Sequence, residues 1–321
     1  MVEGRYYAQD DVINALPSGE WERSRSVVRH WITHSGEAGP TGESGFSAEA
    51  DRYHLFVAWN CPWAHRTLLV RAFKKLDGLI TISAARPNRN EQGWIYDPDG
   101  PFSDPLFGVS ALHEIYSRDA VPYTGRLTVP VLWDKLQNRM VSNESADIVR
   151  MLNTAFSELA PDGPDLVPSD LVQEIETWND LIYRTVNNGV YRAGFSSTQS
   201  AYEKAAEGVF QTLDRIDSVL SGQRYLTGDR FTEADLRLFP TLARFDVAYY
   251  GAFKCNLRRL TDYEHLWPYA REIFQMPGVA ETVNFDIYKR GYYSKSEKRN
   301  PLGIVPIGPD INWRVPPHRG D

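Results

Sequence analysis

Residues 59–76, WNCPWAHRTLLVRAFKKL, are the most informative about the fold, because they join a short apolar run to an amphipathic pattern through a cysteine and a proline. The apolar run, residues 53–59 (YHLFVAW), predicts a buried strand. Beyond it, apolar residues recur at helical spacing, and Gly78 is expected to follow the helix in the left-handed conformation. Another apolar run, residues 79–85, comes next. The order predicted here is therefore strand, helix, strand.

Cys61 falls at the junction between the predicted strand and the predicted helix. Pro62 suits the first helical position, where its missing N–H costs nothing. The unpaired N–H groups and the positive end of the dipole at a helix N-terminus favour a thiolate, which is the reactive form of cysteine. The position therefore predicts that Cys61 is a nucleophile, with an inert buried cysteine as the alternative. No second cysteine follows in Cys-Pro-Trp-Ala, so the resolving thiol is expected to come from a small molecule.

Residues 127–153 (LTVPVLWDKLQNRMVSNESADIVRMLN) predict a strand, a turn, a strand and a helix, with Asn143 as the expected N-cap. Added to the first unit, this is the thioredoxin-like order. A proline that opens a strand opposite such a cysteine is often cis, which would leave the backbone of Val129 free for an incoming peptide. Glu144 and Ser145, at the helix start, suit the ammonium and carboxylate of a γ-glutamyl group. Simple helix capping is the alternative for both residues.

Proline and glycine cluster at residues 159–170 (LAPDGPDLVPSD), and the following sequence is mostly helical. Residues 201–222 form an amphipathic pattern, and Thr232 with Asp235 resembles a capping box. We therefore expect an N-terminal extension at residues 1–50, a thioredoxin-like α/β domain at 51–160, and an all-α domain at 161–321 that ends in an extended tail.

Composition narrows the functional classes. The chain has 321 residues, of which 42% are hydrophobic, and its net charge is −7, which argues against nucleic acid as the main partner. No apolar stretch is long enough to predict a membrane helix, and the first residues lack a secretory pattern. The only cysteines are Cys61 and Cys255, which favours a reducing, cytoplasmic setting and a structural role for Cys255. The seven histidines show no ligand spacing with these cysteines, so no metal is expected.

Several motifs together resemble one family. Residues 60–68 (NCPWAHRTL), 128–134 (TVPVLWD) and 143–148 (NESADI) look like the glutathione transferase superfamily, and specifically its glutathionyl-hydroquinone reductases, the Xi class. The similarity covers most of residues 35 to 310. It continues in AGPTGESGF (38–46), NNGVYRAGF (187–195), TEADLRLFPTLARFD (232–246), YYGAFKCN (249–256) and NPLGIVPIGP (300–309).

The resemblance implies a glutathione transferase fold and a reaction in which free glutathione reduces a glutathionyl-hydroquinone to hydroquinone and glutathione disulfide. It implies that Cys61 forms a mixed disulfide with glutathione and that Tyr191 is the proton donor. Tyr249 and Tyr292 match the family's other tyrosines of the site, although Tyr250 and Tyr293 lie next to them.

The same resemblance assigns residues to glutathione as co-substrate and implies a homodimer. Glu144 and Ser145 would hold the γ-glutamyl end. The other glutathione-binding residues implied are Trp94, Arg126, Leu127, Thr128 and Val129. Departures from the family pattern at residues 85–94, at Ala252 and at residues 290–295 concern the choice of hydroquinone and leave the thiol chemistry intact.

Two other functions remain open at this point. One is a general glutathione-dependent thiol transferase or dehydroascorbate reductase, which would use Cys61 without needing a proton donor to carbon. The other is a non-catalytic transferase-like module for protein assembly. The tyrosine set argues for the reductase over the thiol transferase, and the retention of Cys61 and Pro62 argues against the assembly module.

Overall fold

The computed structural model describes residues 1–7, 16–119 and 121–319. The chain divides into two compact units, and both take residues from the N-terminal part of the sequence. Unit 1 comprises Met1–Asp10 and Ser24–Asp165, whereas unit 2 comprises Asp11–Arg23 and Leu166–Asp321.

Unit 1 is built on a mixed sheet, which has the strand order β2-β1-β3-β4 in the described residues. Its strands are β1 (Tyr53–Ala58), β2 (Ile80–Ala85), β3 (Val131–Asp134) and β4 (Arg139–Ser142). Strand β1 pairs in parallel with β2 and antiparallel with β3, and β3 pairs antiparallel with β4. Every residue of β1 is buried, as expected for a central strand that is covered on both faces.

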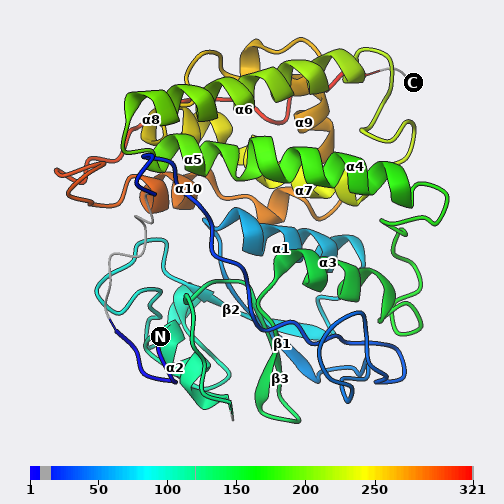
Figure 1. Ribbon diagram of the computed structural model, residues 1–321. Helices are drawn as coiled ribbons and strands as arrows, with labels where there is room; N and C mark the ends of the chain where they lie inside the picture. Colours follow the sequence, from blue (N-terminus) through cyan, green and yellow to red (C-terminus); the bar gives the residue numbers. More distant parts are fainter. Residues whose placement is uncertain (8–15, 120, 320–321) are drawn as a thin grey trace. The chain divides into compact units, whose positions relative to one another are not determined.

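The helices of unit 1 complete the thioredoxin-like order. Helix α1 (Pro62–Phe73) connects β1 to β2, and α3 (Ser145–Thr154) follows β4. The two helices pack together on one face of the sheet (Figure 1). The long connection from β2 to β3 contains the short 3₁₀ turn η1 (Gly100–Phe102) and helix α2 (Leu112–Arg118). The predicted βαβ and ββα orders are therefore confirmed.

Helix α1 ends earlier than its apolar spacing suggested. Lys75, with φ of 54°, takes the left-handed position that we expected for Gly78. The N–H of Leu76 bonds to the carbonyl of Arg71 at 2.8 Å, and the N–H of Lys75 bonds to that of Ala72 at 3.0 Å. These two bonds form a Schellman motif, which closes the helix C-terminus. The expectation for Gly78 was therefore wrong.

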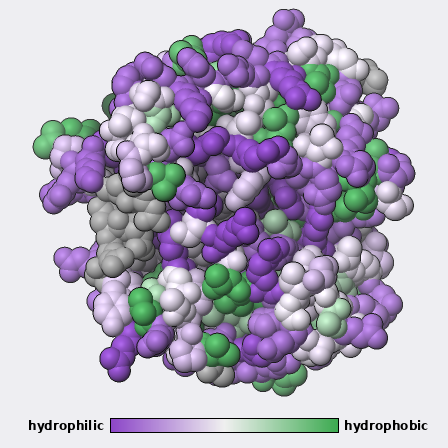
Figure 2. Space-filling model, viewed as in Figure 1, coloured by the Kyte–Doolittle hydropathy of each residue, from purple (hydrophilic) through white to green (hydrophobic). Residues whose placement is uncertain are grey.

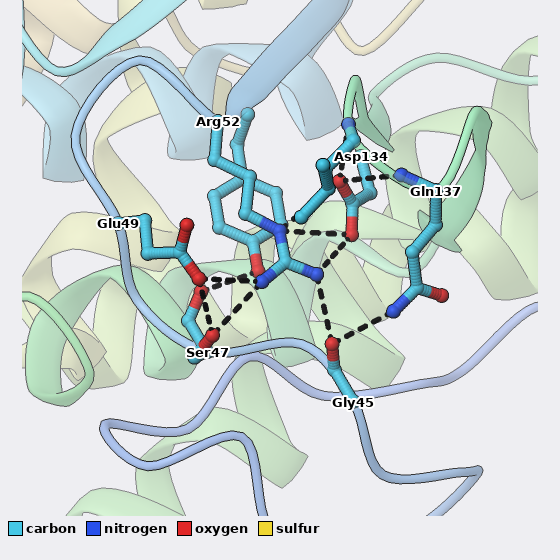
Figure 3. Close-up of polar contacts among 8 residues, drawn as sticks. Gly45, Ser47, Glu49, Arg52, Asp134 and Gln137 are labelled. Atoms are coloured by element: carbon cyan, nitrogen blue, oxygen red, sulfur yellow. Dashed lines mark hydrogen bonds and ion pairs between the residues drawn. The ribbon is translucent and has the colours of Figure 1, made fainter.

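A buried ion pair fixes the N-terminal segment to the sheet (Figure 3). The Nε of Arg52 lies 3.0 and 3.1 Å from the two carboxylate oxygens of Asp134, at the end of β3, and its Nη2 lies 2.5 Å from one of them. The same guanidinium donates to the Gly45 carbonyl and the Ser47 hydroxyl, each at 2.8 Å. Asp134 is fully buried, so this network satisfies charges that would otherwise be costly inside the protein.

Unit 2 is helical in its described residues, as the sequence predicted, and the helices pack mainly as the pairs α4–α7, α5–α6 and α6–α9. Figure 1 shows these helices stacked in layers. The α-helices are α4 (Val172–Ile182), α5 (Gly189–Phe195), α6 (Gln199–Leu220), α7 (Glu233–Arg244), α8 (Tyr250–Ala252), α9 (Leu266–Phe274) and α10 (Phe285–Tyr292). The short 3₁₀ turns η4 (Leu260–Asp262) and η5 (Ala280–Thr282) flank α9. The predicted capping box is present at the start of α7, where the backbone N–H of Thr232 donates to Asp235 at 2.9 Å.

Two π-helical segments, which the sequence did not predict, interrupt this unit within its described residues. η2 (Tyr183–Asn187) lies between α4 and α5, and η3 (Phe245–Tyr249) lies between α7 and α8. A π turn inserts a residue into the helical repeat and so rotates the residues that follow it. Tyr191 lies just after η2, and Tyr249 is the last residue of η3. The π segments therefore help to set the direction of both side chains.

The C-terminal tail packs against the helices of unit 2. Trp313 is buried and lies near the rings of Trp267, Phe274 and Phe285. Arg319 donates to Glu272 at 3.0 Å. Hydrophilic side chains cover most of the face seen in Figure 2, with hydrophobic ones scattered among them. In the described part of the chain, no helix combines the length and the apolar character needed to cross a membrane.

Candidate active site

Cys61 is the N-cap of α1, as predicted from the sequence. Its backbone is extended, with φ of −81° and ψ of 119°, and Pro62 is the first helical residue. The carbonyl of Cys61 accepts the N–H of His65 at 3.0 Å, so the helix begins directly behind the cysteine. The side chain is buried, and its Sγ lies 3.5 Å from the carbonyl oxygen of Val129. The structure therefore combines a free thiol, a helix N-terminus and the backbone of a neighbouring loop.

The loop that carries Val129 is held by phenol groups. The Val129–Pro130 peptide bond is cis, as expected. Tyr116 donates its hydroxyl to the carbonyl of Thr128 at 2.8 Å, and Tyr123 donates to that of Arg126 at 2.7 Å. Burial raises the pKa of both phenols, which therefore keep their protons. The sequence analysis did not identify these two tyrosines. Both donate to backbone carbonyls, which every residue has, so no sequence motif marks the interaction.

Asn143 joins these phenols to the start of α3. Its Nδ2 lies 3.3 Å from the hydroxyl of Tyr116 and 3.4 Å from that of Tyr123, and its Oδ1 accepts the backbone N–H of Val28 at 3.2 Å. The expectation that Asn143 caps the helix was therefore wrong. Its amide is already engaged, and the cap falls one residue later.

Glu144 is the N-cap of α3. Its carboxylate accepts the N–H of Ala146 at 3.1 Å, and Ser145 is the first helical residue and is buried. Helix capping, the alternative considered for Glu144, is thus present in this structure. Asp147, in the first turn, binds Arg29 through two hydrogen bonds of 2.6 and 2.7 Å. The N-terminus of α3 therefore offers backbone donors, a hydroxyl and acids within one turn.

Of the residues expected to bind glutathione, the loop 126–129 and the start of α3 are linked by the network of Tyr116, Tyr123 and Asn143. Leu127 is buried within that loop. Among the described residues, Trp94, another residue expected to bind glutathione, has different contacts. Its carbonyl accepts the N–H of Leu112 at 2.9 Å, and the guanidinium of Arg89 lies 4.4 Å from the centre of its ring. Trp94 is therefore positioned by α2 and by a cation, and lies outside this hydrogen-bond network.

In unit 2, the structure brings Tyr191, Tyr249 and Tyr292 together. The hydroxyl of Tyr292 lies 2.7 Å from that of Tyr191 and 3.0 Å from that of Tyr249, so Tyr292 joins the other two phenols. Their neighbours Tyr250 and Tyr293 lie outside this hydrogen-bonded group, which we call the tyrosine cluster. Tyr250 faces the guanidinium of Arg259 at 5.2 Å.

Aromatic and cationic residues that sequence reasoning missed surround the tyrosine cluster. Trp21 stacks on the ring of Tyr191 with 6.0 Å between centroids, and the Cζ of Arg23 lies 4.8 Å from the centre of the same ring. Arg23 is oriented by a 2.8 Å hydrogen bond to Asn188. Phe253 packs against all three tyrosines, with centroids 5.3 to 5.5 Å away. Trp21 and Arg23 lie in the irregular N-terminal part, where no periodic pattern could mark them.

The environment of the tyrosine cluster keeps the phenols of Tyr249 and Tyr292 protonated. Burial, and then the neighbouring phenols, raise the pKa of Tyr249 and Tyr292 well above the usual value, whereas Arg244 acts in the opposite direction. A protonated phenol can donate to an oxygen or a carbon that gains negative charge. The tyrosine cluster can therefore supply a proton and can share the charge that remains.

Cys255 is fully buried, and burial raises the pKa of its thiol to about 12, so it is unreactive as a nucleophile. Among the described residues, no three or more histidine, cysteine, aspartate or glutamate side chains are grouped so that they could hold a metal ion.

Comparisons with known proteins agree with this geometry. The family model of the glutathione S-transferase N-terminal domain matches residues 60–155, which include Cys61 and the start of α3. The model of the glutathione S-transferase C-terminal domain matches residues 199–272, which include Tyr249. The predicted fold class, a thioredoxin-like domain followed by an all-α domain, is confirmed by these matches.

Similar proteins cover nearly the whole chain. The glutathionyl-hydroquinone reductase YqjG of Escherichia coli is 48% identical, over 91% of this chain and 89% of its own length. PcpF of Sphingobium chlorophenolicum, also named a glutathionyl-hydroquinone reductase, is 45% identical, over 93% and 96% respectively. The glutathione-bound structure of YqjG matches with a TM-score of 0.89 at 46% identity, covering 94% of this chain and 97% of that one.

The solved structures also include a glutathione S-transferase Xi from Phanerochaete chrysosporium. It is 42% identical with a TM-score of 0.87, and covers 94% of this chain and 96% of its own. These matches cover more than nine-tenths of the chain and so extend over both units. The chain therefore belongs to the glutathionyl-hydroquinone reductases, the Xi class of the glutathione transferase superfamily.

Proposed function

We propose that this protein reduces S-glutathionyl-hydroquinones to hydroquinones, with glutathione as co-substrate, through a mixed disulfide between Cys61 and glutathione. The observation that carries the proposal is the placement of Cys61 as the N-cap of α1, with its Sγ 3.5 Å from the carbonyl of Val129. Relatives named for this activity are 45 to 48% identical over most of the chain. The overall reaction is inferred from these relatives, and its steps are assigned below to residues of this chain.

In the first step, the Cys61 thiolate attacks the sulfur of the thioether. A bond forms between Sγ and the glutathione sulfur, and the bond between that sulfur and the aromatic carbon breaks. The electron pair of the broken bond passes to the ring, so the carbon must receive a proton. The backbone N–H groups and the dipole at the start of α1 favour the thiolate that begins this step.

Tyr191 is the proposed proton donor to the aromatic carbon. Its phenol is hydrogen-bonded to that of Tyr292 at 2.7 Å, so the charge left after proton transfer is shared with the tyrosine cluster. Tyr249 extends the same group through its 3.0 Å bond to Tyr292. A positioned general acid contributes a rate factor of about 100 to 10,000.

In the second step, glutathione attacks the mixed disulfide and releases Cys61 as a thiolate. The thiol proton of this second glutathione returns to the phenolate of the tyrosine cluster, so the cycle consumes no net proton. The products of one cycle are hydroquinone and glutathione disulfide. Because Cys-Pro-Trp-Ala contains no second cysteine, the resolving thiol in this scheme belongs to glutathione.

Unit 1 provides the proposed glutathione site. The backbone of Val129 would pair with the backbone of the tripeptide, as an added strand does. Ser145 and the N–H groups of α3 would hold the γ-glutamyl carboxylate, and Glu144 its ammonium. The remaining contacts would come from Trp94, Arg126, Leu127 and Thr128. The first turn of α3 already holds a buried hydroxyl and a capping acid, which supports this assignment.

The test compares two substrates in parallel. Hydroquinone release from glutathionyl-hydroquinone is followed by chromatography, and thiol transfer is followed with a glutathione mixed disulfide. We expect Cys61→Ser to abolish both reactions. We expect Tyr191→Phe to lower hydroquinone release by about 100-fold and to leave thiol transfer within twofold. Tyr250→Phe, a neighbour outside the tyrosine cluster, is the control and should behave as the wild type.

The second candidate is a general thiol transferase or dehydroascorbate reductase. The isolated thiol of Cys61 supports it equally well, because disulfide exchange has a thiolate leaving group and needs no acid for carbon. The hydrogen-bonded tyrosine cluster favours the reductase. Turnover of the mixed disulfide alone, with no hydroquinone release from the thioether, would establish this second function instead. Activity on neither substrate would favour the non-catalytic assembly module.

The family also leads us to propose a homodimer in a reducing, cytoplasmic compartment. Both cysteines are free in the structure, which suits such a compartment. Light scattering on purified protein at several concentrations tests the dimer, and a mass of one chain at all concentrations would refute it.

A further inference from the structure

Arg244, the last residue of α7, places a cation beside the tyrosine cluster. Its side chain is completely buried, and its Nη1 donates to the carbonyl of Pro240 at 2.8 Å. The Cζ of its guanidinium lies 3.8 Å from the ring centre of Tyr288, so the planar group rests on an aromatic face. A buried arginine keeps its proton, because its pKa is intrinsically very high.

Tyr288 connects Arg244 to the tyrosine cluster. Tyr288 and Tyr292 are four residues apart on α10, so their side chains project from the same face of the helix. That helix packs against η3, which begins immediately after Arg244 and ends at Tyr249. The chain therefore brings the guanidinium and the phenols together from α7, η3 and α10.

The electrostatic coupling agrees with this geometry. Burial disfavours the charged guanidinium. The ionised forms of the phenols of Tyr288, Tyr292, Tyr249 and Tyr191 favour it, and the pKa of Arg244 is raised. The positive charge of Arg244 in turn lowers the pKa of Tyr249 and Tyr292, against the larger effect of burial, which raises it. Arg23 also faces the cluster, and lies over the ring of Tyr191 from the N-terminal segment.

We propose that Arg244 is a positioning residue whose buried charge stabilises the phenolate formed when the tyrosine cluster protonates the leaving aromatic carbon. This inference rests on the proposed function, because it assigns a counter-charge to the acid of that reaction. As the C–S bond breaks, the proton leaves Tyr191, and the negative charge is spread over three phenols by their hydrogen bonds. The thiol proton of the second glutathione restores the phenol.

Low polarity makes this counter-charge effective. A preorganised cation in a buried site stabilises developing charge more strongly than it could in water, and needs no reorganisation during the reaction. Removal of one preorganised donor of this kind typically lowers kcat by a factor of about 100 to 1,000. Disulfide exchange at Cys61 forms no phenolate, so Arg244 should matter for one reaction and not for the other.

The experiment compares Arg244→Gln with Arg244→Lys, which keeps the charge. Arg271→Gln is the matched control, because Arg271 is also a buried arginine of unit 2 that faces an aromatic ring, that of Trp267 at 5.1 Å. For each protein we would measure kcat and KM for hydroquinone release from pH 6 to 9, thiol transfer to a glutathione mixed disulfide, and the thermal midpoint. Tyr191→Phe is assayed alongside.

We expect Arg244→Gln to lower kcat for hydroquinone release by about 100-fold, with KM changed less than threefold and thiol transfer within twofold. Arg244→Lys should recover at least a tenth of the wild-type kcat, and Arg271→Gln should match the wild type. Equal losses in Gln and Lys variants that fold, or a parallel loss of both reactions, would mean a purely structural role and overturn the inference. If Tyr191→Phe has no effect, the proposed acid itself fails, which is a separate result.

Discussion

The hydroxyl of Tyr292 lies 2.7 Å from the hydroxyl of Tyr191, although the two residues are separated by 101 positions in the chain. Tyr292 also bonds to Tyr249, so it is the central member of the tyrosine cluster. A phenol that loses a proton is stabilised by donors at this distance, and the central residue controls how far the charge spreads.

Tyr292→Phe should therefore weaken hydroquinone release without abolishing it. The variant keeps the ring that packs against Phe253 and removes the hydroxyl that joins Tyr191 to Tyr249. Loss of one hydrogen bond to a charged group costs about 1.5 to 3 kcal/mol, which corresponds to a roughly 10- to 100-fold lower kcat. Steady-state kinetics on the thioether measure this effect, with thiol transfer as the internal control. If Tyr292→Phe lowered kcat more than Tyr191→Phe, the assignment of Tyr191 as the proton donor and Tyr292 as its supporting partner would be contradicted.

The two cysteines should differ in reactivity. Cys255 is fully buried, and its thiol pKa is raised to about 12, so it should resist alkylation in the native protein. We expect iodoacetamide at neutral pH to label Cys61 alone and to inactivate the enzyme, with glutathione slowing the labelling. Peptide mass spectrometry identifies the modified residue, and Cys255→Ser should keep its activity. Native labelling at Cys255 ahead of Cys61 would overturn the assignment of the nucleophile.

The ion pair of Arg52 and Asp134 should contribute strongly to stability. Asp134→Ala would leave the Arg52 guanidinium buried without its carboxylate, and breaking such a pair costs about 3 to 5 kcal/mol. Asp170→Ala is a matched control, because it breaks an exposed pair with Arg230, and exposed pairs contribute much less to stability. Urea unfolding gives both free energies. Equal effects would show that the buried network is not the anchor of the N-terminal segment.

His54 should make the folded state sensitive to acid. It is buried between the hydroxyls of Thr81 and Ser83, at 2.7 and 2.8 Å, and burial lowers its pKa to about 4. The unfolded chain takes up this proton near pH 6.5, whereas the folded protein does not until about pH 4. Stability from His54 is therefore complete above pH 6.5 and falls between pH 6.5 and 4.

The loss amounts to about 3 kcal/mol across that window, because each pH unit between the two pKa values contributes about 1.4 kcal/mol. Urea unfolding at pH 4.5, 5.5 and 7.0, repeated for His54→Asn, measures it. The variant should be less stable at pH 7.0 and should show a shallower dependence on pH. An equally steep dependence in both proteins would assign the acid sensitivity to other groups.

Gly194 allows the close packing of Phe253 beside the tyrosine cluster. A Cβ at this position would come within 2.3 Å of the Phe253 ring, so Gly194→Ala must displace a residue that contacts all three tyrosines. We expect lower hydroquinone release and a lower thermal midpoint. Gly208→Ala in α6 meets nothing within 4 Å, and should stabilise the protein by up to about 1 kcal/mol. Unchanged kinetics in Gly194→Ala would show that Phe253 does not support the tyrosine cluster.

Features that depend on residues close together in the chain could be predicted from the sequence. Cys61 and Pro62 at the start of α1, and the capping box of Thr232 and Asp235, were predictable because a cap acts within one helical turn. The strand and helix order followed from apolar periodicity, which reports the buried face of each element. The family resemblance then implied that Tyr191, Tyr249 and Tyr292 belong to the active site.

Contacts between groups far apart in the chain could not be predicted from the sequence and depend on the folded structure. Asn143 does not cap α3, because its amide is drawn to Tyr116 and Tyr123, and Trp21 reaches Tyr191 from the irregular N-terminal part. The tyrosine cluster forms between α5, η3 and α10, whose residues carry no mutual spacing in the sequence. Its buried cation, Arg244, is indistinguishable in the sequence from any arginine at a helix end. The physical reason is that local patterns fix φ, ψ and burial, whereas hydrogen bonds and charges across a core depend on packing of segments far apart in the chain.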